Sequence, residues 1–282
     1  MRMLALAVDS ETVGREGAPG THPEFDRLIR TIWRLRQPDG CPWDKVQTHE
    51  SITKNMVEEA YEAVETIAQG DMAHLREELG DVLEQVVLHS QIAQDSGEFD
   101  IDDVCRELNE KLVRRHPHVF GDPAAAGAVD SAGQVLDIWD KVKKEEREGS
   151  DSVQAGLLDS VPLSLPALMQ CQKISKRAAK AGFEWESVTD VWDQVESERA
   201  EFEAEERGTA KAAEEFGDIL FALVNVARWE GIDAEEALAA SNRKFRRRWA
   251  AMEEIARDEG FALDEQSTER LNELWRQVKQ GE

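Results

Sequence analysis

The chain has 282 residues, 41% hydrophobic and 33% charged, and a formal net charge of −25. Such an acidic chain repels nucleic-acid backbones and anionic membranes, so we expect neither as a partner. The three cysteines, Cys41, Cys105 and Cys171, follow no zinc or disulfide spacing, which favours a reducing cytoplasmic location. The apolar start is too short for a convincing signal peptide, and no apolar run approaches the roughly 20 residues of a membrane span.

Capping residues and apolar periodicity predict an all-α chain. A disordered lead-in is expected at residues 1–22, an N-terminal helical domain at 23–120, a linker with one helix at 121–160 and a C-terminal helical domain at 161–282. The expected helices are 24–36, 51–69, 72–95, 101–116, 134–147, 164–181, 188–206, 209–230, 234–258 and 268–279. Their short connections predict four-helix-type bundles.

The second set of helices repeats the first. Glu78 and Asp81 recur as Glu215 and Asp218 at a constant spacing of 137 residues. Other matching motifs recur at offsets between 133 and 139, in the same order along the chain. Offsets this similar indicate a duplicated helical unit with small insertions.

Two carboxylate pairs in each half are candidate metal ligands. Residues three apart share a helix face, so antiparallel packing of two such helices would bring four carboxylates together. Their mutual repulsion would be relieved by a hard cation such as Mg²⁺. The first half offers Glu59, Glu62, Glu78 and Asp81, and the second offers Glu198, Glu201, Glu215 and Asp218.

A plain alternative is that these acids form exposed helix surface, which is the usual place of a Glu-x-x-Glu motif in an acidic helical protein. Two observations favour a metal site. Apolar residues flank Asp81 and Asp218, where an acid is costly unless it is paired or bound to metal. The whole set also recurs in both halves.

Basic residues follow each acidic set. Lys111 and Arg115 are four apart on one helix, as are Lys244 and Arg248 on another. Near bound metal, such residues commonly hold a phosphate chain, whereas at a helix C-terminus they interact with the helix dipole. The second explanation suits Arg115, because Pro117 ends its helix.

The sequence resembles the MazG nucleoside triphosphate pyrophosphohydrolases from about residue 24 to the end. In the first half the resemblance lies in GCPWDKVQTHESI, VEEAYEAVETI, EELGDVLEQVV and KLVRRHPHVFGD. In the second half it lies in LPALMQCQKISKRAAKAGFEW, EEFGDILFALVNVAR and SNRKFRRRW.

The resemblance implies hydrolysis of NTPs or dNTPs to the monophosphate and pyrophosphate, in nucleotide-pool housecleaning or a stress response. It also implies Mg²⁺, with Mn²⁺ as an alternative, and a homodimer or higher homo-oligomer. By similarity to the two-domain members, the C-terminal domain is the expected catalyst. In the N-terminal half, His74 and Glu84 stand where the second copy has Lys211 and Phe221, which argues against turnover there.

By the same resemblance, both carboxylate sets bind metal, and Glu198 and Glu201 are the catalytic candidates. The substrate-binding candidates are Lys211, Asn242, Lys244, Arg248, Trp275, Lys111 and Arg115. Two alternative functions stay open. One is a non-catalytic helical interaction module, and the other is hydrolysis of a different phosphoanhydride, such as a phosphoribosyl-ATP or an alarmone of the guanosine tetraphosphate type.

Overall fold

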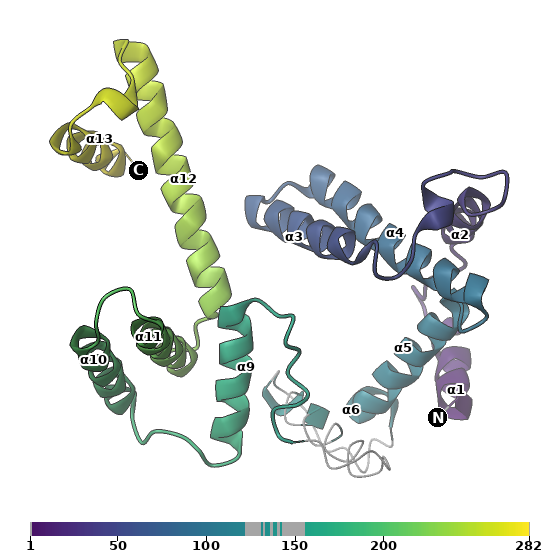
Figure 1. Ribbon diagram of the computed structural model, residues 1–282. Coiled ribbons are helices and arrows are strands. Elements are labelled where there is room, and N and C mark those ends of the chain that lie inside the picture. The colour runs from purple at the N-terminus through teal and green to yellow at the C-terminus, as the bar shows by residue number, and fades with distance from the viewer. Residues whose placement is uncertain are drawn as a thin grey trace. The chain divides into compact units, whose positions relative to one another are not determined.

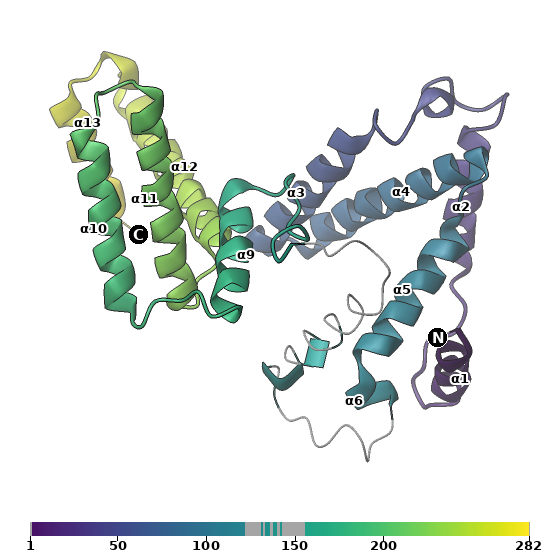
Figure 2. The ribbon, with the colours of Figure 1, turned by 60° about the horizontal axis from the view of Figure 1, so that its bottom comes forward.

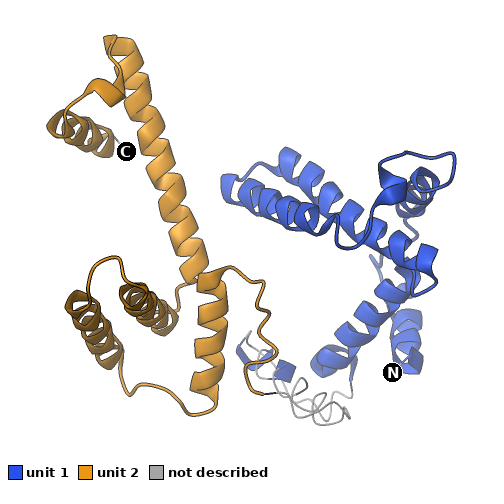
Figure 3. Ribbon diagram, in the orientation of Figure 1, with its two compact units in different colours: residues 1–151 blue, residues 152–282 orange. Residues whose placement is uncertain are grey.

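The computed structural model describes residues 2–121, 131, 133–135, 138, 139, 142 and 156–281, and every regular element in these ranges is helical (Figure 1). The all-α prediction is therefore confirmed. The chain divides into two compact units, residues 1–151 and 152–282 (Figure 3). In the part of the chain that the structure describes, every helix is too short or too polar to cross a membrane.

Unit 1 is organised around one long helix, α4. Helices α2, α3 and α5 each contact α4, and α1 contacts α5. Ile32, Ile52, Val87, Leu88 and Ile92 form its buried core. The elements are α1 (Arg2–Val13), α2 (Pro23–Leu35), a 3₁₀ turn (Asp44–Val46), α3 (Thr53–Gln69), α4 (Met72–Ser96), α5 (Ile101–Arg115) and α6 (Pro117–Phe120).

Residues 2–13 form helix α1, so the predicted disorder at 1–22 does not hold for them. Ala5 is buried at 5% exposure, and α1 packs on α5. A short apolar segment followed by acidic residues carries no local sequence signal for a stable helix. A tertiary contact supplies the stability that local sequence does not reveal.

The turn between α3 and α4 has the residues that its geometry requires. Gly70 ends α3 at φ 73°, a left-handed conformation that glycine adopts without a steric penalty. Asp71 then caps α4 by accepting hydrogen bonds from the backbone N–H groups of Ala73 and His74. This tight turn lays α3 along α4, which places their acidic pairs on facing helices.

Unit 2 contains a matching pair, α10 (Val188–Ala204) and α11 (Ala210–Trp229), which lie side by side (Figure 2). Helix α9 (Ala167–Lys180) contacts α11 and α12 (Ala234–Glu259). After a 3₁₀ turn at Leu263–Glu265, α13 (Thr268–Gln280) folds back on α12. The core between α10 and α11 is Val191, Val195, Ala222 and Val226.

The unit boundary lies within the range predicted as a linker, 121–160. Most of that range, including most of the helix expected at 134–147, lies outside the described residues.

Candidate active site

Three carboxylates converge between α10 and α11 in unit 2. Glu198 and Glu201 come from α10 and Glu215 from α11, and each offers an oxygen atom within 4.8 Å of the others. Desolvation is the main cause that raises the pKa of Glu215, and the negative charge of Glu201 raises it further. Crowded carboxylates of this kind are stabilised when a cation neutralises them.

Asp218, the fourth predicted ligand of unit 2, lies outside this three-oxygen group and is exposed. It lines a pocket together with Glu198. The structure thus assembles three of the four predicted carboxylates and leaves Asp218 on the neighbouring wall.

The corresponding set in unit 1 is Glu59 on α3 with Glu78 and Asp81 on α4, again with oxygens within 4.8 Å of one another. Here Glu62 is the predicted ligand that lies outside the group, and it is exposed. Desolvation and then the charge of Asp81 raise the pKa of Glu59. The two units therefore omit different members of the predicted sets.

Glu78 provides a direct sign that its cluster suits a cation. Its side chain is 8% exposed, and Oε1 lies 2.8 Å from His74 Nε2. Its other oxygen, Oε2, is buried with no hydrogen-bond partner. Because every donor in both clusters is a carboxylate oxygen, a hard divalent cation such as Mg²⁺ or Mn²⁺ fits them better than a soft metal does.

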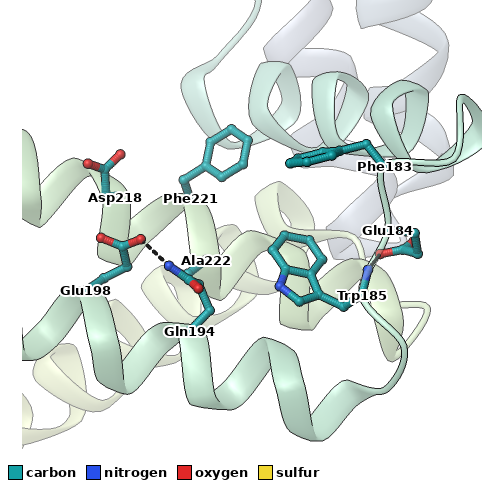
Figure 4. A pocket seen from close by; sticks show the side chains of 8 residues that line it. All are labelled: Phe183, Glu184, Trp185, Gln194, Glu198, Asp218, Phe221 and Ala222. Carbon is teal, nitrogen blue, oxygen red and sulfur yellow. Dashed lines mark hydrogen bonds between the residues drawn. The ribbon is translucent and has the colours of Figure 1, made fainter.

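A pocket of about 360 Å³ opens beside the unit 2 carboxylates. This volume falls in the range of small-molecule sites, roughly 300–1,000 Å³. Its lining residues are Phe183, Glu184, Trp185, Gln194, Glu198, Asp218, Phe221 and Ala222 (Figure 4). The rings of Phe183, Trp185 and Phe221 surround one end, and the carboxylates of Glu198 and Asp218 lie at the other.

Gln194 connects these two ends. Its Nε2 donates a 2.6 Å hydrogen bond to Glu198 Oε1, which fixes the rotamer of a cluster carboxylate. The arrangement can hold a flat aromatic group between ring faces while a charged group reaches the carboxylates and their cation.

The predicted phosphate-binding residues occupy two places in unit 2. Lys211, at the start of α11, forms an ion pair with Glu205, and that bond raises the pKa of its ammonium group. Asn242, Lys244 and Arg248 lie on α12. The guanidinium carbon of Arg248 lies 5.5 Å from the ring centroid of Trp275 on α13, a cation–π contact.

Helices α12 and α13 continue away from the α10–α11 pair in Figure 1. Trp275 also contacts Phe245 on α12, and the centroids of their two rings lie 5.0 Å apart. In unit 1, Lys111 is exposed and Arg115 is half-buried on α5, which packs on α1 and α4. Phosphate contacts by these residues stay predictions.

The sequence alone did not single out Phe183, Gln194 or Phe221 as pocket residues. A signal was present in Gly182-Phe-Glu-Trp185, an apolar pair in a short link between two helices, next to an acidic helix. The pocket forms only because the link packs beside α10 and α11, and the sequence of the link does not specify that packing.

Comparison with known proteins matches residues 47–120 to the MazG nucleotide pyrophosphohydrolase domain. The nucleoside triphosphate pyrophosphohydrolase of Escherichia coli K12 is 45% identical over 264 residues, which cover 92% of this chain and 98% of that protein. The nucleoside triphosphate pyrophosphohydrolase/pyrophosphatase MazG of Thermotoga maritima is 41% identical over 258 residues, 92% of this chain and 96% of that protein. A crystal structure of a mazG-related protein from Thermotoga maritima aligns over 42% of this chain and 98% of its own, at 29% identity and a TM-score of 0.36.

Proposed function

This chain belongs to the MazG nucleotide pyrophosphohydrolase family, and we propose that it hydrolyses nucleoside triphosphates to the nucleoside monophosphate and pyrophosphate. The relatives from Escherichia coli and Thermotoga maritima are named for this class of activity. One structural observation carries the proposal. In unit 2, a carboxylate cluster that suits a hard cation adjoins a pocket with three aromatic walls.

Unit 2 is the proposed catalyst. Its pocket is apolar where unit 1 has charge, since Phe221 corresponds to Glu84 at the repeat spacing. A nucleobase can stack on ring faces, while its triphosphate extends toward Glu198 and Asp218. The charge on Glu84 would disfavour the same arrangement in unit 1.

Mg²⁺ is the proposed cofactor, with Mn²⁺ as an alternative, and Glu198, Glu201, Glu215 and Asp218 are its proposed ligands. When bound, the cation would neutralise phosphate oxygens and ease the build-up of charge on the departing pyrophosphate. Glu59, Glu62, Glu78 and Asp81 would hold a cation in unit 1.

Glu198 or Glu201 is the proposed proton acceptor. Water attacks the α-phosphorus opposite the bridging oxygen, its proton passes to one of these carboxylates, and the bond to pyrophosphate breaks as the new P–O bond forms. Gln194 holds Glu198 in place for this step. Lys211, Lys244 and Arg248 are proposed to neutralise the leaving pyrophosphate, with Asn242 and Trp275 contacting the nucleotide.

Product analysis in H₂¹⁸O tests the reaction. Incubation of the chain with Mg²⁺ and a panel of dNTPs should yield monophosphate and pyrophosphate, with ¹⁸O in the monophosphate because water attacks the α-phosphorus. Diphosphate plus inorganic phosphate would contradict the proposal. Turnover confined to phosphoribosyl-ATP or an alarmone would replace the substrate class, and no turnover at all would favour an interaction module.

A matched pair of variants tests the choice of unit. Glu215→Gln and Glu78→Gln change the same position of the repeat in α11 and α4. Glu215→Gln should lower pyrophosphate release by about 100-fold or more, since it removes a ligand that supports several kcal/mol of charge stabilisation. Glu78→Gln should leave most of the activity. The reverse result would move catalysis to unit 1.

We propose that the chain acts as a homodimer in the cytoplasm. Large apolar side chains on the α10–α11 pair are 39–49% exposed within one chain: Trp192, Phe216, Leu220 and Leu223. We propose that these side chains belong to an apolar surface that a second copy covers in the homodimer.

A further inference from the structure

The aromatic wall of the unit 2 pocket stands on a short link, residues 181–187, between α9 and α10. Its two ends are fixed by backbone geometry. Gly182 leaves α9 at φ 95°, a left-handed conformation, and Ser187 begins α10 in a capping box with Asp190. The middle of the link carries Phe183 and Trp185, whose rings face the pocket, and between them Glu184, whose carboxylate lies beside the backbone N–H of Trp185 (Figure 4).

Glu184 holds the middle of the link to α11. Arg228 Nη1 donates to its Oε2 at 2.6 Å, and Nη2 donates to its Oε1 at 2.7 Å. Trp229 Nε1 and the backbone N–H of Trp185 also donate to Oε1, at 3.1 and 3.0 Å. The hydrogen bond from Arg228 is the main reason that the pKa of Glu184 is lowered. A two-pronged ion pair that is largely sheltered from solvent fixes direction as well as distance.

Arg228 is itself held from behind by buried polar groups. Its Nε donates to Ser175 Oγ on α9 at 2.7 Å. Ser175, 5% exposed, donates to Asn225 Oδ1, and Asn225 is fully buried. Asn225 Nδ2 in turn donates to the carbonyl oxygen of Phe221 at 3.0 Å. The network therefore ties both aromatic sides of the pocket, Phe221 and the 181–187 link, to one buried centre.

Unit 1 holds its corresponding link with a different network. Leu88 and Gln91 stand where α11 has Asn225 and Arg228. Pro42 precedes Trp43 where Glu184 precedes Trp185. Gln91 Nε2 donates to Asp95 at 2.8 Å, Asp95 pairs with Arg36, and Arg36 donates to the backbone carbonyl oxygens of Asp44 and Gln47. The arginine of unit 1 therefore holds its link by the backbone, whereas Arg228 holds Glu184, the residue between Phe183 and Trp185.

We propose that Arg228 is a positioning residue for nucleobase recognition: through Glu184 it holds Phe183 and Trp185 as the base-stacking wall of the unit 2 pocket. The inference rests on the proposed function, since it assigns the pocket to the base of the triphosphate substrate. It predicts that the network governs binding of the base and leaves the hydrolytic step untouched.

The test compares a dNTP with methyl triphosphate, a substrate that has the same phosphates and no base. Arg228→Met should raise KM for the dNTP by about tenfold or more, as expected when base stacking is lost. Its kcat for the dNTP and its kcat/KM for methyl triphosphate should stay near wild type. Arg199→Met, an exposed arginine of α10 paired with Glu196 and Glu203, is the control and should leave all these values unchanged.

A loss of kcat that is equal on both substrates would assign Arg228 a general structural role and overturn the proposal, as would an unchanged KM for the dNTP. If Arg228→Met does not fold, Glu184→Gln decides, because it keeps the shape of the side chain and removes its charge. It should give the same split between substrates with a smaller rise in KM, and an unchanged KM would overturn the proposal. Wild-type chain that releases pyrophosphate from neither substrate would instead refute the proposed function.

Discussion

His49 and His89 lie side by side in unit 1, with their Nδ1 atoms 2.8 Å apart and their ring planes within 5° of parallel. At this distance one Nδ1 donates and the other accepts, so at least one ring is neutral. Burial, and then the charge of His49, lowers the pKa of His89. The pair joins the segment before α3 to α4, so protonation of both rings would oppose this contact.

Replacing His89 by Val, the residue found at the matching position of α11, should weaken the pH dependence of unit 1 stability. The folded-state pKa of His89 lies below that of a free histidine, about 6.5, so the unfolded chain binds the proton first as the pH falls. Wild-type stability should be greatest above about pH 6.5 and decline below it, by no more than about 1.4 kcal/mol per pH unit for one proton. His89→Val should show a shallower decline.

Urea unfolding at several pH values reads out this change, with hydrogen exchange of α4 peptides identifying the transition of unit 1. His22→Gln, which removes an exposed histidine, serves as the control and should keep the wild-type slope. An undiminished slope in His89→Val would show that the histidine pair carries none of the pH dependence.

Glu84→Gln should stabilise unit 1 at neutral pH. Desolvation raises the pKa of Glu84, and the charges of Asp81 and Asp44 raise it further. The ionised carboxylate therefore opposes folding above its folded-state pKa, and this cost vanishes as the pH falls below the pKa of the unfolded chain, about 4.3. The gain should be at most about 1 kcal/mol, because solvent screens a partly exposed charge.

Thermal unfolding without metal at neutral pH and near pH 4 measures this gain, which should be present at the first pH and absent at the second. Glu65→Gln, an exposed glutamate of α3, provides the comparison and should change stability little at either pH. Equal gains at both pH values would mean that packing of the amide, and not removal of charge, stabilises the variant.

Local sequence predicted most helix ends, because caps act over a few residues. Asp71, Asp100 and Gly70 stand where the structure places the ends of α3, α4 and α5. Distant pairings escaped prediction. Glu184 and Arg228 are 44 positions apart, and nothing in either segment specifies the other.

The carboxylate site was predictable in outline for a similar reason. A spacing of three residues identifies a shared helix face, and so the acids of each hairpin were expected to converge. Which acid stays outside the group depends on helix rotation and depth. Those are set by core packing, and they leave out Glu62 in one unit and Asp218 in the other.

Trp275→Ala should loosen α13 from α12, whereas Trp275→Phe should largely preserve their packing. Trp275 contacts the ring of Phe245 and the guanidinium of Arg248, and the adjacent Leu274 is fully buried. The alanine variant should cost about 2 kcal/mol, less than the roughly 3–5 kcal/mol of a fully buried tryptophan, because Trp275 is partly exposed.

Hydrogen exchange across α13 measures this loosening, and pyrophosphate release measured alongside separates packing from substrate contact. If Trp275 contacts the nucleotide as proposed, Trp275→Phe should keep slow exchange in α13 and still raise KM. A phenylalanine variant with wild-type KM would limit Trp275 to a packing role.

Leu220→Glu should convert the proposed homodimer to a monomer. Leu220 is 42% exposed on α11, where Phe216 and Leu223, one turn before and after it, are also exposed. A second copy covering this surface would bury the new carboxylate without a partner, which costs several kcal/mol. Because about 1.4 kcal/mol corresponds to a tenfold change in an equilibrium constant, the dimer dissociation constant should rise by a factor of about 100 or more.

Leu163→Glu is the control, because Leu163 is 91% exposed in the segment before α9 and its replacement should leave the assembly intact. Light scattering after size exclusion gives the mass of each variant. A wild-type monomer would refute the homodimer, and a Leu220→Glu variant with wild-type mass would show that the copies meet through another surface.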